Sequence, residues 1–382
     1  MPRLPTTSRF RACLLGVALA LAAQLCGAQS APTSDAPSTA PSLSPGPPGI
    51  ADPQFGPPAT PPAARGPSIA LVLPLEAPAY ARVADAVRAG FMAAAEAAGM
   101  TDRCVVIGHR DDGVIGAFDA ARERGVHVIV GPLVRDDLKT LAIAGGQWPN
   151  TVALNQLDDG SPLPPNTWSL ALSVESDARV LARAAMRDGV KAIDIVEGDS
   201  PLMHRLAATF SGEWVGIGGA APAGYAVDAS PESLGALRKA LVKALPDAVL
   251  LALDGERAAL VKPYVSGIGA YASGLAFDRP PATAARDLED VRIVDIPWII
   301  KPDAPEFARL PRREFGNAAL TRLYALGLDA FRVAQAFVDG PPERLTVDGA
   351  IGRLTLDGHT FQREGRLAVY RDGQLVPLDS PR

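Results

Sequence analysis

The chain has 382 residues, of which 48% are hydrophobic and 21% are charged. This length is enough for one or two domains with a substantial core. The formal net charge is −5, so the sequence lacks the basic excess that is typical of proteins that bind nucleic acids.

The first 28 residues have the features of a secretion signal. Three arginines precede the apolar run Ala12–Leu25, which is short for a membrane span, and small residues then suit cleavage before Gln29. Lipidation of Cys26 is the alternative, but Leu25 stands where lipoprotein processing favours a small residue. We therefore expect residues 1–28 to be a signal peptide of a periplasmic protein, with an outer-membrane lipid anchor as the second interpretation.

A proline-rich segment follows the signal. Residues 29–67 contain 12 prolines among Ala, Ser, Thr and Gly, without any apolar periodicity. Such a composition predicts a disordered tether, so the folded part is expected to begin near Ser68. Cleavage of the signal would leave Cys104 as the single cysteine, in a stretch that is typical of a buried strand.

From Ser68 onward, the hydrophobic pattern predicts alternating strands and helices. Ile69–Leu73 is a continuous apolar run, which is typical of a strand buried on both faces of a parallel sheet. Apolar residues then recur at helical spacing over residues 79–98. The same unit recurs, with strands expected at Cys104–Ile107, Val126–Val130, Thr151–Leu154 and Trp168–Leu172 and helices at Gly116–Arg124 and Asp136–Ala144. This alternation predicts a parallel, doubly wound sheet with right-handed crossovers.

A second series of the same kind starts after Ser173. Helices are expected at Ser176–Asp188, Pro201–Trp214, Pro231–Ala244 and Ala318–Val338, and strands at Ala192–Val196, Ala248–Leu253 and Val291–Ile296. Near the C-terminus, the segments Gly352–Gly358 and Leu367–Gly373 instead predict short antiparallel strands with Asp-Gly turns. The sequence therefore predicts two α/β sheets and a late β-hairpin.

No motif indicates a metal or a nucleotide site. The glycine clusters at 216–219 and 267–269 complete neither a dinucleotide-binding fingerprint nor a phosphate-binding loop. The histidines are isolated and lack the spacing of zinc ligands: His109, His127, His204 and His359. We therefore expect no metal and no cofactor.

A serine-hydrolase triad is the catalytic alternative. Ser200 follows a predicted strand, and Asp357 and His359 come late in the chain. However, the sequence contains no GxSxG elbow, and Ser200 before Pro201 is a good helix start, with a capping hydroxyl and a proline at the first position. We expect capping rather than catalysis, and thus a protein that is not an enzyme.

In an open α/β sheet, ligands bind beyond the carboxyl ends of the strands. Here those ends lead into the loops Pro74–Glu76, Gly131–Val134 and Asn155-Gln156, each followed by a helix N-terminus or a bend that can accept an anion. The candidates for contact with a ligand or partner in this cleft are Leu75, Glu76, Tyr80, Leu133, Val134, Asn155, Gln156 and Trp298.

Several segments resemble a known family in the same order. Ile69–Leu75 followed by a helix, and then Val128–Leu133, resemble type I periplasmic binding proteins. The later segments resemble the C-terminal domain of the penicillin-binding protein activator LpoA (LppC) family: Ala153–Gln156, Asp295–Trp298, Arg322–Ala330, Gly352–Asp357 and Tyr370–Gly373. The resemblance extends over residues 68 to 378, and the combination in this order is specific.

The resemblance implies a type I periplasmic-binding-protein fold, in which two lobes each contain a mostly parallel, doubly wound sheet. It also implies three crossover segments, which we place near Ser173, Trp298 and Leu345. Lobe 1 is then expected to contain residues 68–172 and 298–344, and lobe 2 residues 173–297 and 345–382. The expected role is contact with a class A penicillin-binding protein, a bifunctional peptidoglycan synthase, and stimulation of its cross-linking activity. On this resemblance, we expect the proline-rich segment to stand in place of the family's helical N-terminal domain.

A solute-binding protein for amino-acid uptake is the competing interpretation. Amino-acid binders of this fold hold the ligand carboxylate with hydroxyls and amides after the Gly-Pro turn. Here the stretch after that turn is Leu133–Asp137, and the first hydroxyl beyond it is Thr140. The carboxylates of Asp136 and Asp137 would repel an anionic ligand. The sequence therefore favours a protein partner, with another small molecule in the interlobe cleft left open.

Overall fold

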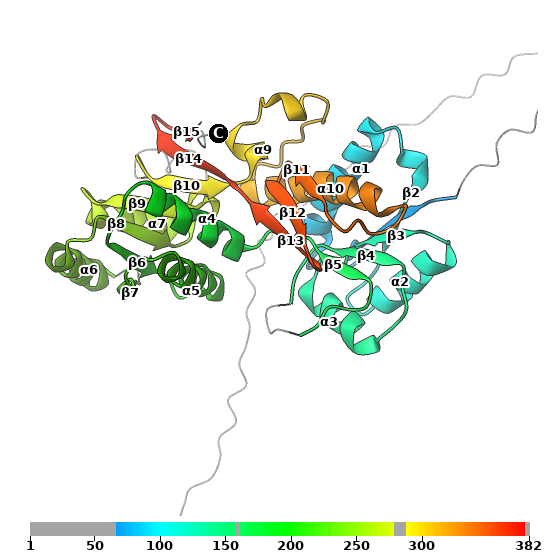
Figure 1. Ribbon diagram of the computed structural model, residues 1–382, viewed down its shortest axis with the longest axis horizontal. Helices are drawn as coiled ribbons and strands as arrows, with labels where there is room; N and C mark the ends of the chain where they lie inside the picture. The colour runs from blue at the N-terminus through cyan, green and yellow to red at the C-terminus, as the bar shows by residue number, and fades with distance from the viewer. Residues whose placement is uncertain (1–65, 158–160, 229, 279–287, 379–382) are drawn as a thin grey trace, which may run out of the picture. The chain divides into compact units, whose positions relative to one another are not determined.

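A computed structural model describes residues 66–157, 161–228, 230–278 and 288–378 (Figure 1). The expected signal peptide (residues 1–28, with Cys26) and nearly all of the expected tether (29–67) lie outside the described residues. The described chain forms two separate sheets. Lobe 1 is defined here as the sheet that contains β1 with the helices packed on it, and lobe 2 as the sheet that contains β6 with its helices.

The sheet of lobe 1 has eight strands in the order β11-β12-β13-β5-β4-β3-β1-β2. Strands β1 to β5 are parallel, and β13 pairs in parallel with β5. Strand β12 pairs antiparallel with β13, and β11 pairs antiparallel with β12. The strands are β1 (Ile69–Leu73), β2 (Cys104–Gly108), β3 (Val128–Val130), β4 (Asn150–Ala153), β5 (Thr167–Ser169), β11 (Thr346–Asp348), β12 (Arg353–Asp357) and β13 (Thr360–Glu364).

The sheet of lobe 2 has seven strands in the order β15-β14-β10-β9-β8-β6-β7. Strands β6 to β10 repeat the parallel arrangement of β1 to β5 in lobe 1, and the hairpin β14–β15 adds to β10 in antiparallel fashion. The strands are β6 (Ile193–Glu197), β7 (Gly224–Ala226), β8 (Ala248–Ala252), β9 (Gly269–Ser273), β10 (Arg292–Asp295), β14 (Arg366–Arg371) and β15 (Gln374–Pro377).

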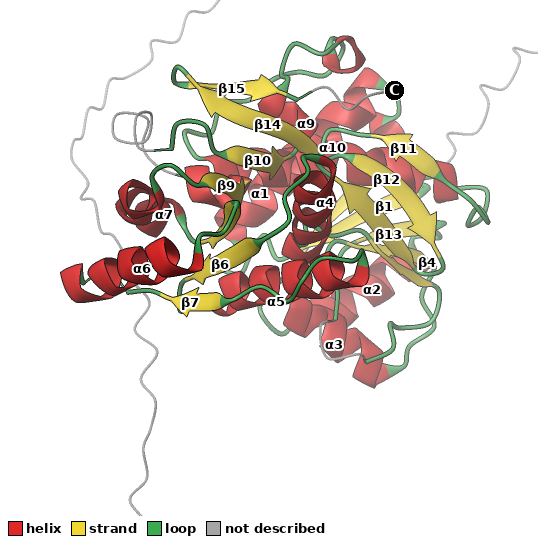
Figure 2. Cartoon of the chain, turned by 60° about the vertical axis from the view of Figure 1, so that its left-hand side comes forward, coloured by secondary structure: helices red, strands yellow, loops and turns green. Residues whose placement is uncertain are grey.

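Helices cover both faces of each sheet (Figure 2). The α-helices are α1 (Ala81–Ala97), α2 (Val114–Glu123), α3 (Arg135–Ala144), α4 (Val174–Arg187), α5 (Pro201–Gly216), α6 (Pro231–Ala244), α7 (Gly255–Val261), α9 (Pro297–Ile300) and α10 (Ala318–Phe337). Short 3₁₀ turns lie at Thr101–Arg103, Lys262–Val265, Gly274–Phe277 and Pro305–Phe307. None of the described helices is both long and apolar enough to cross a membrane.

The alternation of side chains along each strand explains these layers. In β1, Ile69, Leu71 and Leu73 pack against α1 and α10, whereas Ala70 and Val72 pack against α2 and α3. Strand β8 divides its side chains in the same way between α6 and α7 on one face and α4 and α5 on the other. Both faces of β1 and of β8 are therefore buried, as their continuous apolar runs predicted.

Helices α1 and α10 pack unusually closely, because each carries a glycine at the contact. A Cβ atom built on Gly90 would lie 1.9 Å from the carbonyl oxygen of Tyr324, and one built on Gly327 would lie 2.1 Å from that of Val87. No side chain larger than hydrogen fits at either position while the two backbones keep this distance. Side chains of these two helices form a large part of the central core of lobe 1.

The structure confirms the predicted two-sheet α/β class and corrects the assignment of the C-terminal strands. The segments Gly352–Gly358 and Leu367–Gly373 are not partners in one hairpin. Strand β12 pairs with β13 in the lobe 1 sheet, whereas β14 pairs with β15 in the lobe 2 sheet. Residues 346–364 therefore belong to lobe 1, not to lobe 2 as expected for the whole of 345–382.

Within the described residues the chain passes between the lobes three times, and one passage differs from its predicted place. The first lies between β5 and α4, beside Ser173, and the second lies around α9, which contains Trp298. The third lies at Gly365 between β13 and β14, not near Leu345 (Figure 1). The prediction was wrong here because β11 to β13 add to the lobe 1 sheet, next to β5, before the chain crosses.

Candidate functional site

The loops beyond the carboxyl ends of β3 and β4 surround a hollow of 560 Å³ in lobe 1. It is lined by four of the predicted cleft residues, namely Tyr80, Leu133, Val134 and Asn155. Apolar side chains make up much of the remaining wall: Val83, Leu154, Leu172, Leu323 and Leu326. The topology rule for open α/β sheets therefore locates a real concave site here, and its wall is mainly apolar.

Two polar side chains that line this hollow, Asn155 and Arg135, bond to the protein itself. Asn155 donates from Nδ2 to the carbonyl oxygen of Leu133 (2.9 Å) and accepts from the backbone N–H of Gln156 (2.9 Å). Arg135 donates from Nε to the carbonyl oxygen of Gln156 (3.1 Å). The hydroxyl of Thr140 donates to a carbonyl oxygen in its own helix (2.9 Å). These contacts brace the loops against one another and do not form the hydroxyl clamp of an amino-acid site.

The other predicted residues lie elsewhere. Gln156 lines a neighbouring hollow of 520 Å³, where its Nε2 donates to Glu175 of α4 (3.4 Å), which also pairs with Arg205 of α5 (3.0 Å). Leu75 packs against the core of lobe 1. Glu76 is exposed and lies 3.5 Å from Nε of Arg110. The structure thus brings together only part of the predicted set.

Trp298 is a core residue rather than a cleft residue. Its side chain is 2% exposed and packs edge-on against Phe307, with ring centroids 5.1 Å apart. The ring also contacts Tyr324 (6.0 Å) and lies beneath the guanidinium of Arg312 (4.2 Å). The prediction that Trp298 faces a ligand is therefore corrected, because the second crossing turns this side chain into the lobe 1 core.

The sequence interpretation missed two buried ion pairs that join the lobes. Arg322 of α10 in lobe 1 donates to both carboxylate oxygens of Asp295, at the end of β10 in lobe 2 (2.8 and 2.6 Å). Its remaining terminal nitrogen donates to both oxygens of Asp278 (2.8 Å each). This fork-to-fork geometry is the strong form of an arginine–carboxylate pair. Gly274 makes room for it, since a Cβ there would lie 2.1 Å from Asp295.

The second pair joins β13 to α4. Arg363 of β13 donates to the carboxylate of Asp177 and to the carbonyl oxygen of Ser173 (3.2 Å). It also donates to the carbonyl oxygen of Ile351 (3.2 Å). The side chain of Arg363 is 3% exposed. A guanidinium that is this deeply buried is stable only when carboxylate or carbonyl oxygens accept its hydrogen bonds.

Both pairs line one cavity of 210 Å³ between the lobes. Its apolar wall comes from lobe 1 (Leu172, Leu323) and from lobe 2 (Leu202, Leu275). Burial disfavours the charged form of Arg322, but the two neighbouring carboxylates outweigh that effect and raise its pKa. Burial raises the pKa of Asp177 against the opposing effect of Arg363. Arg322 therefore remains charged, and its charge is matched by two carboxylates of the protein.

One signal in the sequence could have indicated the first pair. Arg322 stands at a helical position flanked by buried residues, and Asp295 closes an apolar strand. A charged residue at a core position implies a buried partner of opposite sign. The sequence contains no signal that identifies which acidic and basic residues meet.

The catalytic and metal alternatives find no geometric support in the described chain. Ser200 caps α5 by accepting from the N–H of Leu202 (3.3 Å), as predicted. His359 instead stacks on Trp168, with its Nδ1 2.9 Å from the carbonyl oxygen of Thr167. Across the described ranges, no three His, Cys, Asp or Glu side chains are grouped as metal ligands.

Comparison with known proteins places this architecture in a family. A model of the family described as "LppC putative lipoprotein" matches residues 64–230 and 244–373. The chain belongs to this family. The penicillin-binding protein activator LpoA of Edwardsiella piscicida is 28% identical in an alignment of 306 positions that covers 68% of this chain and 44% of that protein. The chain thus spans less than half the length of this curated relative.

Two solved structures share the fold. A protein described as "a putative branched-chain amino acid ABC transporter" from Chromobacterium violaceum is 31% identical, with a TM-score of 0.70, over 79% of this chain and 99% of that one. The LpoA C-domain of Haemophilus influenzae, described as a regulator of PBP1A, has a TM-score of 0.68 at 22% identity, over 81% of this chain and 99% of that one. These likenesses confirm the predicted type I periplasmic-binding-protein fold.

Proposed function

We propose that this protein is a non-enzymatic regulator of peptidoglycan synthesis that binds and activates a class A penicillin-binding protein. The observation that carries the proposal is the pairing of the buried interlobe charges with one another. In a solute-binding protein such groups would be available to a ligand, whereas here Arg322 and Arg363 are already bound to carboxylates of the protein. Family membership supports the same conclusion, since the curated relatives are named activators.

Direct mixing with the partner tests this proposal. The purified mature chain is added to the class A penicillin-binding protein of the same organism with lipid II as substrate, and cross-linked muropeptides are quantified. We expect a saturable increase in cross-linking and a measurable affinity between the two proteins. Unchanged cross-linking, together with no detectable binding, would contradict the proposal. Heat-denatured chain at the same concentration serves as the control.

A second candidate function is the binding of a small solute that has an apolar side chain, such as a branched-chain amino acid. The specific observations in its favour are the mainly apolar 560 Å³ hollow and the 31% identity to the Chromobacterium violaceum protein. A thermal-shift assay with leucine, isoleucine and valine tests it, because a ligand that binds only the folded state raises the melting temperature. A melting temperature that stays constant up to millimolar ligand would count against this candidate.

We further propose that the protein acts in the periplasm after export. The apolar run in residues 12–25 and the family's description as lipoproteins support this location. Mass spectrometry of the mature N-terminus separates the two forms. A free N-terminus at Gln29 indicates simple cleavage, and a diacylglyceryl mass on Cys26 indicates a lipid anchor.

A further inference from the structure

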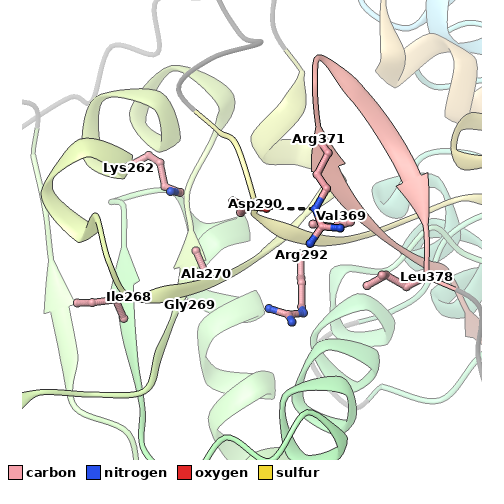
Figure 3. Close-up of a pocket in the computed structure, with 9 residues that line it drawn as sticks. All are labelled: Lys262, Ile268, Gly269, Ala270, Asp290, Arg292, Val369, Arg371 and Leu378. Atoms are coloured by element: carbon pink, nitrogen blue, oxygen red, sulfur yellow. Dashed lines mark hydrogen bonds and ion pairs between the residues drawn. The ribbon is translucent and has the colours of Figure 1, made fainter.

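Two hollows that share one lining residue form a basic groove, of which the larger lies between the lobes and the smaller lies in lobe 2. The larger, of 800 Å³, is bordered by α4, by the segment that follows β10, by β12 and by the β13–β14 junction. The smaller, of 230 Å³, lies beside β9, β10 and β14, and the two share Leu378 (Figure 3). We call the continuous surface formed by both the crossover groove.

The charge of this groove is opposite in sign to that of the whole chain. Eight basic and four acidic side chains line it, whereas the chain as a whole carries a net charge of −5. Figure 3 shows three of the basic side chains, Lys262, Arg292 and Arg371, around the smaller hollow. A concave surface with one excess sign of charge concentrates the electrostatic field and attracts a partner of the opposite sign.

Much of the positive charge is not neutralised within the groove. Four of the eight basic side chains have an ion-pair partner: Arg371 pairs with Asp290 (3.2 Å), Arg292 with Asp188 (3.0 Å) and Arg183 with Glu213 (2.7 Å), and Arg353 lies 3.8 Å from Asp348. In contrast, none of the ion pairs found in the described part of the chain involves Arg187, Lys301, Arg366 or Lys262. Arg187 and Lys301 are also exposed to solvent. These two side chains are therefore available to an incoming carboxylate.

The groove fits a polypeptide better than a membrane or a uniformly anionic polymer. Its surface is concave, whereas a lipid surface is flat on this scale. Acidic side chains such as Glu306 and Glu364 are interspersed with the basic ones and would repel a surface of uniform negative charge. A peptide with a predominance of Asp and Glu can place its carboxylates on Arg187 and Lys301 and a basic or neutral residue beside Glu306.

We propose that the crossover groove is the docking surface for an acidic segment of a protein partner. This inference rests on the proposed function in one respect, namely that the segment belongs to the penicillin-binding protein. A bound segment would contact α4 of lobe 2 and β12 of lobe 1 together, so its affinity depends on the arrangement of the two lobes.

Charge reversal in the groove tests the inference. The double variant Arg187→Glu/Lys301→Glu is compared with Arg82→Glu/Arg124→Glu, an equal change of charge at exposed positions on α1 and just after α2 of lobe 1. Affinity for the class A penicillin-binding protein is measured by biolayer interferometry. We expect at least a tenfold loss for the groove variant and less than a twofold change for the control. Arg187→Gln/Lys301→Gln should give an intermediate loss, and circular dichroism verifies that every variant is folded.

A synthetic probe separates this inference from the proposed function. A fluorescein-labelled, glutamate-rich peptide of about 12 residues should bind the wild-type chain, and the affinity should weaken as salt shortens the screening length. If the chain binds this peptide through the groove but does not bind the synthase, the proposed function fails and the groove stands. If the groove variant keeps wild-type affinity for both, the inference is overturned. Binding of phosphatidylglycerol vesicles through the groove, without groove-dependent peptide binding, would also overturn it.

Discussion

Arg322 of α10 holds Asp295 of β10 through two hydrogen bonds of 2.8 and 2.6 Å, and this pair connects one lobe to the other. The side chain of Arg322 is 11% exposed and that of Asp295 is 5% exposed. Solvent therefore screens this contact little, in contrast to the many ion pairs at the surface. Because the third nitrogen of Arg322 binds Asp278, a single guanidinium organises two segments of lobe 2.

Removal of this guanidinium should destabilise the protein strongly. In Arg322→Met, two carboxylates lose their partner, and the loss of one member of a buried pair costs about 3–5 kcal/mol. Arg322→Lys should recover only part of this lost stability, because an ammonium group cannot make the bidentate contact with a carboxylate. Denaturant unfolding gives the free energy of unfolding for each variant.

Arg88→Met is the matched control for this prediction. Arg88 pairs with Asp85 at 2.5 Å, but its side chain is 46% exposed, so we expect a change below about 1 kcal/mol. Equal losses for Arg322→Met and Arg88→Met would show that the interlobe pair adds nothing beyond a surface contact. Small-angle scattering should in addition detect a change in the radius of gyration only for the Arg322 variants.

The contact between α1 and α10 predicts that replacing Gly327 destabilises the protein. In Gly327→Ala, the new methyl group would lie 2.1 Å from the carbonyl oxygen of Val87, so the helices must separate at a cost of about 1–3 kcal/mol. Gly235→Ala in α6 meets no atom within 4 Å and should instead stabilise the protein by about 0.5–1 kcal/mol. Thermal melts of both variants test this difference in sign, and two changes of the same sign would refute it.

The burial of Trp298 predicts a loss of stability rather than a loss of binding. Trp298→Ala leaves a cavity between Phe307 and Tyr324, and such changes cost about 3–5 kcal/mol. Tyr80→Ala removes a side chain that lines the 560 Å³ hollow and is 38% exposed, so its effect on stability should be small. If urea unfolding gave the two variants the same midpoint, Trp298 would not be part of the core.

The order and type of the main elements could be predicted from local pattern alone. Pro231–Ala244 was predicted to the residue, because proline after a capping serine marks its start and apolar spacing marks its length. The lobe to which β12 belongs could not be predicted. Its alternation of buried Leu354 and Leu356 with exposed neighbours would suit either sheet, and the choice depends on pairing with distant strands.

The site was less predictable than the fold for a related reason. The topology rule located the hollow around Leu133 and Asn155, since it depends only on where strands end. The pairs Arg322–Asp295 and Arg363–Asp177 join residues that lie 27 and 186 positions apart. The packing of the two lobes determines which residues pair. No local sequence pattern contains that information.

Cys104 provides a prediction of pH dependence. Burial, followed by the charge of Asp102, raises the pKa of its thiol to about 11, with Arg103 opposing. At pH 8 its thiolate fraction, and thus its alkylation by iodoacetamide, should be at least about 100-fold lower than for an ordinary thiol. The rate should rise about tenfold per pH unit up to pH 11, as measured by mass spectrometry of the Cys104 peptide, with N-acetylcysteine as the reference.

The raised pKa of Cys104 also makes the free energy of unfolding depend on pH. The folded state binds the thiol proton more tightly than the unfolded state, so this group contributes stability below pH 8.5, and that contribution is lost as the pH rises toward 11. Cys104→Ser or Cys104→Ala should therefore show a shallower decline of the free energy of unfolding over this range than the wild type. A labelling rate that matches N-acetylcysteine at pH 8, or parallel stability curves for wild type and variant, would show that partial burial does not raise the pKa of this thiol.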